Sequence, residues 1–163
     1  MERIDLFRAF FTEESDYYAD KLEKYEQGTK YSFNFWAGFL GPVWFCFRKL
    51  YVEALVLFLL TFVLSSITAV VLWLIIPNEQ IIVPFSTAFI TIISFVILGY
   101  LGNTLYLKKS KKIVEDFISE NDIENINNSL TSELREKGGT SMAAALVCAG
   151  IQIAIQILSK VIT

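Results

Sequence analysis

The sequence has no histidine, only two cysteines and only three prolines among its 163 residues. Without histidine the chain lacks the commonest general base and the commonest metal ligand, which excludes Ser–His and Cys–His catalysis and histidine-bearing zinc sites. Cys46 and Cys148 lie in apolar stretches, and we interpret them as buried thiols rather than as a disulfide framework. The sequence also contains no Walker-type loop and no CxxC motif. We therefore expect a protein that is not an enzyme and that binds no metal and no cofactor.

Charged residues are scarce as well, at 19% of the chain, whereas about a quarter is usual in soluble domains. Two long stretches, residues 54–76 and 81–101, contain no charged side chain at all. Each has roughly the 20 apolar residues that an α-helix needs to cross a hydrocarbon layer of about 30 Å. The pattern predicts an all-α membrane protein in which residues 51–107 form a transmembrane helical hairpin.

Basic residues flank this hairpin on both outer sides, and the link at residues 77–80 has none. The positive-inside rule then places the N-terminus and residues 108–140 in the cytoplasm. We expect the lysines after the second span to contact lipid headgroups. Nucleic-acid binding is not expected there, because the segment lies beside the membrane and lacks interleaved aromatic residues. The lysines in question are Lys108, Lys109, Lys111 and Lys112.

The segment 31–50 is predicted to form an interfacial or re-entrant elbow before the first span. Its uncharged stretch is too short to cross the membrane comfortably, and Gly41-Pro42 interrupts it, although a spanning segment is an alternative. Two tryptophans suit the level of the lipid headgroups. The residues assigned to this elbow are Asn34, Trp36, Gly41, Pro42, Trp44, Arg48 and Lys49. Glu53 is expected to pair with Arg48 or Lys49, and Asn103 to end the second span or to hydrogen-bond the elbow.

Three further segments are expected to be helical. Residues 1–30 predict an amphipathic cytoplasmic helix or helix pair, because apolar residues recur in them at helical spacing. This apolar stripe packs either on the rest of the cytoplasmic part or on the membrane surface. Residues 108–140 predict two more cytoplasmic helices. Residues 141–163 predict a third transmembrane helix, with a buried or interfacial helix as the alternative.

The segment 32–51 resembles the signature of a family of bacterial membrane proteins, domain of unknown function 2628, also called HrgC-like. Phe35 stands where the family usually has tryptophan, with Trp36 beside it. Gly102-Asn103 and Tyr106 resemble the end of the family's second span, and residues 138–141 the turn before its final apolar stretch. The resemblance implies this membrane architecture and the bacterial inner membrane, but no activity and no catalytic residue. The matching elbow residues are Phe33, Asn34, Ala37, Phe39, Gly41, Pro42, Trp44, Arg48, Lys49 and Tyr51.

Each predicted span carries a stripe of small or polar side chains. Such stripes pack helices against one another, or they line a water-filled path in an oligomer. Two amides one turn apart on the last helix are awkward to expose to lipid, which favours the second interpretation. The candidate pore-lining residues are Thr61, Ser65 and Thr68, then Thr87, Thr91 and Ser94, and finally Gln152, Gln156 and Ser159.

The leading functional hypothesis is therefore a small homo-oligomeric channel or pore-forming protein with a cytoplasmic regulatory part. Two or three helices cannot enclose a path alone, so the expected partners are the lipid bilayer and further copies of the chain. The alternative is a non-conducting membrane adaptor that holds a cytoplasmic protein partner. Its predicted docking faces are the apolar stripes around Phe7 and Phe11 and around Ile126 and Leu130.

Overall fold

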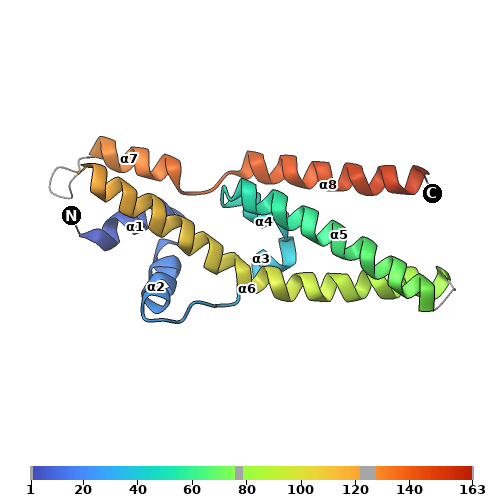
Figure 1. Ribbon diagram of the computed structural model, residues 1–163. Coiled ribbons are helices and arrows are strands. Elements are labelled where there is room, and N and C mark those ends of the chain that lie inside the picture. The colour runs from blue at the N-terminus through green and yellow to red at the C-terminus, as the bar shows by residue number, and fades with distance from the viewer. Residues whose placement is uncertain (1, 76–78, 122–127, 163) are drawn as a thin grey trace.

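The computed structural model describes residues 2–75, 79–121 and 128–162, and over these ranges the chain forms helices and no strand (Figure 1). The predicted all-α class is confirmed. The order is α1 (Arg3–Phe11), α2 (Ser15–Glu26), α3 (Phe35–Leu40), α4 (Pro42–Phe47), α5 (Tyr51–Ile75), α6 (Glu79–Asn121), α7 (Asn128–Lys137) and α8 (Met142–Ile162).

Three helices, α5, α6 and α8, are long and apolar enough to cross a membrane, which agrees with the three predicted spans. Only 6% of the apolar stretch of α5 and 17% of that of α6 is buried within the chain. In α8, Leu146 and Val147 are 66% and 63% exposed, so this helix is not a buried core helix. These exposed apolar faces are suited to contact with lipid tails.

Helix α6 continues without a break from the second span into the predicted cytoplasmic part. Its 43 residues rise about 65 Å at roughly 1.5 Å per residue, about twice the thickness of a hydrocarbon layer. Figure 1 shows α5, α8 and the first half of α6 extending toward one end of the molecule. We call these helices, with residues 79–101 of α6, the membrane arm. The head comprises α1, α2, α7 and residues 102–121 of α6, at the other end.

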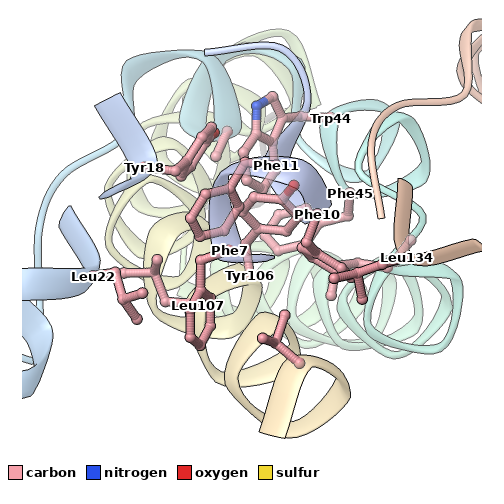
Figure 2. Packing of buried hydrophobic residues seen from close by; sticks show 14 of the residues in the cluster. Phe7, Phe10, Phe11, Tyr18, Leu22, Trp44, Phe45, Tyr106, Leu107 and Leu134 are labelled. Carbon is pink, nitrogen blue, oxygen red and sulfur yellow. The ribbon is translucent and has the colours of Figure 1, made fainter. Parts of the chain in front are cut away.

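The head surrounds an aromatic core that also takes in α4 (Figure 2). Phe7, Phe11 and Tyr18, on the stripe predicted for residues 1–30, are at most 1% exposed. The stripe therefore packs into the protein as a helix pair and does not lie on the membrane surface. Rings from α1 and α2 meet Tyr106 of α6, with the Tyr18 and Tyr106 centroids 4.8 Å apart in an edge-to-face arrangement.

The elbow consists of two short helices, α3 and α4, which meet at Gly41. This glycine has φ of 56° and ends α3, and Pro42 begins α4, where a missing N–H costs nothing. Helix α3 packs on α6, and α4 packs on α5 and α8. Trp36 is 57% exposed, as a headgroup contact requires, whereas Trp44 is only 4% exposed. The prediction of a headgroup position for Trp44 is wrong, because its ring fills the aromatic core beside Phe45 and Tyr106.

Candidate functional site

Two asparagines fasten the elbow to α6. The Asn34 side chain accepts a hydrogen bond from the Ala37 backbone N–H at 2.9 Å, which caps α3, and its amide donates to Asn103 Oδ1 at 2.8 Å. Asn103, fully buried, donates in turn to Ser32 Oγ at 2.9 Å and to the Tyr17 hydroxyl at 3.1 Å. The expected contact of Asn103 with the elbow is confirmed. Since every polar atom of this pair has a structural partner, it is a clasp between elements rather than a reactive site.

Close approach of α3 to α6 depends on glycines. A Cβ added at Gly102 would lie 2.4 Å from Ala37 Cβ, and one at Gly38 would lie 2.6 Å from the Phe95 carbonyl oxygen. A Cβ at Gly99 would collide with the Phe33 ring at 2.2 Å. These contacts are too short for any larger side chain, so the glycines fix how deeply the elbow sits on α6.

Arg48 directly follows α4 near the end of the elbow, and its side chain is 2% exposed. It forms an ion pair with Glu14, whose side chain is 57% exposed, and its guanidinium lies 4.7 Å from the Tyr18 ring centroid and 5.3 Å from that of Tyr106. The expected pairing of Glu53 with Arg48 is wrong, because the fold brings the loop between α1 and α2 over Arg48. Within the described residues no ion pair joins Glu53 to Lys49 either, since Lys49 donates to the Glu136 carbonyl oxygen. Burial raises the pKa of the Tyr18 phenol above its ordinary value of 10.0, although the positive charge of Arg48 opposes this shift.

The basic residues predicted to contact headgroups divide into two groups. Lys109 donates to the Lys49 carbonyl oxygen, and Lys111 pairs with Glu26 at 3.1 Å, so both take part in contacts within the chain. Lys108 and Lys112 are exposed, and headgroup contact stays a prediction for them. Lys49 itself donates to the Glu136 carbonyl oxygen at 2.8 Å, which ties the elbow to the end of α7.

The hydroxyl stripes of the membrane arm are largely satisfied by their own helices. Thr61 donates to the Leu57 carbonyl oxygen at 2.9 Å, and Thr87 and Thr91 donate to carbonyl oxygens one turn back at 2.8 and 2.7 Å. Such bonds allow a hydroxyl to face lipid without water. Ser65 is exposed, and Thr68 and Ser94 are partly buried. The hydroxyls therefore give less support to a pore than their spacing indicated.

An apolar groove of about 330 Å³ lies between α8 and α5, next to the contact of α8 with α4. Cys46 and Cys148 both line it, and both are free. Burial, followed by a hydrogen bond with the Cys148 thiol, raises the pKa of Cys46 to about 12, so this thiol is a poor nucleophile at neutral pH. The lining residues are Pro42, Cys46, Tyr51, Ala54, Leu55, Phe58, Ala144, Val147, Cys148, Ile151 and Gln152.

Gln152 is the one primary amide that lines this groove. It is partly buried, and within the described part of the chain no hydrogen bond involves its side chain. Gln156, one turn further on, is exposed and has an interaction of its own. The side chain of Ser159 lies outside the described residues. Of the two described polar residues predicted on this helix, Gln152 lines the groove and Gln156 does not.

The head carries an open hollow of about 640 Å³ between α1, α7 and the loop after α1, which sequence reasoning missed. Arg8 and Arg135 line it together with Asp5 and Glu13, and within the described ranges no ion pair involves Arg135 or Glu13. Thr12 and Glu14 in the adjoining loop have positive φ, of 54° and 60°, which is strained for side chains of this kind. Helical periodicity could not have found the hollow, because its residues come from elements more than 100 positions apart.

A protein-family model described as a protein of unknown function, DUF2628, matches residues 9–112. These residues are more than half of the 163-residue chain and include the asparagine clasp, Arg48, the elbow and the four lysines. The groove-lining helix α8 lies outside the match. So do four of the residues that line the hollow, namely Asp5, Arg8, Thr131 and Arg135. No curated protein and no solved structure matches the chain.

Proposed function

Because the chain belongs to the DUF2628 family, whose function is unknown, we propose a function from its own geometry: a non-conducting membrane adaptor that holds a cytoplasmic protein partner. The observation that carries this proposal is the hollow on the head, where Arg135 and Glu13 form no ion pair with any described residue. A surface that presents both signs of charge favours a polar protein segment that carries both signs. Helix α6 runs without a break from the membrane arm into the head, so it would hold a partner bound to the head close to the membrane.

The proposed docking surface differs from the one that the sequence indicated. Phe7 and Phe11 belong to the aromatic core and are not available to a partner. Ile126 lies outside the described residues, and Leu130 is partly buried against the core. What remains exposed on the head is mainly charged, so salt is expected to weaken the binding of the partner.

The adaptor proposal also requires an orientation. Basic residues on both outer flanks of the hairpin support a head on the cytoplasmic side of a bacterial inner membrane. The exposed Lys108 and Lys112 would lie where α6 leaves the bilayer, and there they would contact anionic headgroups.

The test is isolation of the full-length protein from membranes with the variant Arg135→Glu. We expect a soluble protein recovered in stoichiometric amount with the wild type and lost with Arg135→Glu. The matched control is Lys30→Glu, which reverses an exposed charge in the loop between α2 and α3, away from the hollow, and is expected to keep the partner. The proposal would be contradicted if Arg135→Glu and Lys30→Glu recovered the partner in equal amounts. It would also be contradicted if neither the wild type nor Lys30→Glu recovered a partner.

A homo-oligomeric channel is the second candidate, and Gln152 is the observation that favours it. An amide that has no hydrogen-bond partner among the described residues could be satisfied by water in a path between subunits. The measurement is single-channel recording of the purified protein in a planar bilayer. Discrete conductance steps that disappear in a Gln152→Leu variant that still assembles would favour the channel, and a silent wild type would favour the adaptor.

A further inference from the structure

Within the described residues, helix α8 contacts its own chain mainly through α4. Its N-terminal end is held against α4, where the Ser141 N–H donates to the Phe47 carbonyl oxygen at 2.8 Å and Ala145 is 7% exposed. Beyond this point it leaves α5, and the apolar groove opens between the two helices. By contrast, α5 and the first half of α6 pack against each other.

Gln152 lies at the deep end of this groove. Counted from Met142, where α8 begins, it is ten residues along the helix, or about 15 Å, which is close to the middle of a hydrocarbon layer about 30 Å thick. Its amide meets no hydrogen-bonding group within the described residues. Lipid tails offer no donor or acceptor at that depth, so a lipid tail in the groove would leave the amide unsatisfied.

We propose that a second copy of this chain packs its α8 into the groove, in parallel, so that the two Gln152 amides hydrogen-bond to each other. Two copies inserted in the same orientation are related by an axis along the membrane normal, which brings equal residues to equal depth. A primary amide has both donors and an acceptor, so two of them satisfy each other reciprocally. The small side chains of Ala144 and Cys148 on the same side of α8 permit the close approach of two helices.

The test is the dimerisation equilibrium of the full-length protein in lipid vesicles, measured by energy transfer between labelled copies as the protein-to-lipid ratio is varied. Gln152→Leu is expected to raise the dissociation constant of the dimer by about 10- to 1,000-fold, the range that corresponds to two interhelical hydrogen bonds in lipid. Gln152→Asn keeps an amide and is expected to lose less. The control Ile153→Leu, at a 57% exposed position outside the groove, is expected to leave the constant unchanged.

A second measurement does not depend on the folding of the Gln152 variants. In a Cys46→Ser chain, Cys148 is one turn from Gln152 and is expected to form a disulfide between copies when copper–phenanthroline accepts its electrons. Leu146→Cys, placed on the exposed face of α8 in a chain that lacks both native cysteines, is expected to cross-link poorly. A wild type that stays monomeric, a Gln152→Leu variant that dimerises as tightly, or cross-linking mainly through position 146 would overturn the proposal.

Discussion

Arg48 brings a positive charge into the aromatic core between the elbow and the head. Its Nε and Nη1 atoms are buried and have no hydrogen-bond partner within the described part of the chain, so Glu14 and the faces of nearby rings must offset the lost hydration. A buried charge of this kind contributes less to stability than to fixing a geometry, because its desolvation is costly. Here it fixes the loop between α1 and α2 over the elbow.

Replacing Glu14 with glutamine tests how far Glu14 offsets the desolvation of the Arg48 charge. We expect Glu14→Gln to lower the free energy of unfolding by about 1–2 kcal/mol, because the Arg48 charge then remains buried without its counter-ion. The half-exposed position of Glu14 keeps the expected loss below that of a fully buried pair. The double variant Glu14→Gln/Arg48→Met is expected to recover much of the lost free energy of unfolding, since no charge is then left in the core.

Denaturation in detergent, followed by tryptophan fluorescence, measures both effects because Trp44 lies in this core. If the double variant were less stable than the single one, the ion pair would be a net source of stability instead.

The buried phenol of Tyr18 predicts sensitivity to alkaline pH. Burial raises the pKa of Tyr18 in the folded chain above its ordinary value of 10.0, so the folded state holds its proton where the unfolded state releases it. The contribution to stability is complete below about pH 10 and declines as the pH rises further.

Thermal unfolding at increasing pH, compared between the wild type and Tyr18→Phe, checks the prediction for Tyr18. The Phe variant is expected to lose less stability above pH 10, and equal slopes for the two chains would count against it.

Asn103 and Glu14 differ in how far their contacts could be predicted from the sequence. Asn103 was predictable as an elbow contact, because an amide that follows two glycines at the end of an apolar run needs a partner. The partner of Arg48 was not predictable, since Glu14 is one acidic residue among several in a polar loop. Its position over Arg48 depends on the strained loop conformation, which no sequence pattern indicates.

Among the elements, the helices whose apolar stretches are long were predicted most fully. The absence of charge over a span is enough to predict α5 and the first half of α6, because the membrane imposes their length. Periodicity also identified the apolar faces of α1 and α2, but it could not say whether protein or lipid covers them. The continuity of α6 was only one of the options, since its lysines allow either a break or a solvated helix.

Gly138 and Gly150 differ in the space around them, and this difference gives a prediction for stability with its own control. A Cβ at Gly138 would lie 2.1 Å from the Phe10 carbonyl oxygen, where α1 meets the end of α7, whereas one at Gly150 would meet nothing within 4 Å. Gly138→Ala must displace backbone and is expected to cost about 1–3 kcal/mol. Gly150→Ala is expected to be neutral or stabilising by up to about 1 kcal/mol, because alanine favours the helix.

The measurement for both glycine variants is the thermal midpoint in detergent, where copies are dilute. Equal midpoints for the two variants would show that the α1–α7 contact is looser than the structure has it.

For the molecule as a whole, three helices of spanning length and a helical head make a definite prediction of topology. An odd number of spans places the head and the end of α8 on opposite sides of the membrane. A fluorescent protein joined before residue 2 is expected to fold in the cytoplasm, and alkaline phosphatase joined after residue 163 to be active outside. With the two reporters exchanged, phosphatase activity at the N-terminal end would reverse the orientation. Fluorescence at the C-terminal end as well as at the N-terminal end would mean that α8 does not span.

The family assignment made from the elbow is confirmed by the family model, and the membrane class by the three long apolar helices. The charged hollow and the groove beside α8 were beyond sequence reasoning, because each depends on how distant elements are packed. Oligomerisation, conduction and the identity of any partner stay predictions at this scale.

The unbroken course of α6 links two environments that membrane proteins often separate with a loop. A helix with a long apolar stretch tilts further in a thinner bilayer. Since Tyr106 on α6 is held in the aromatic core by α1 and α2, the head cannot keep its orientation while the membrane arm leans. The hollow on the head then changes its height above the headgroups. For this protein, the thickness of the surrounding bilayer would therefore change how the hollow on the head is presented to its proposed partner.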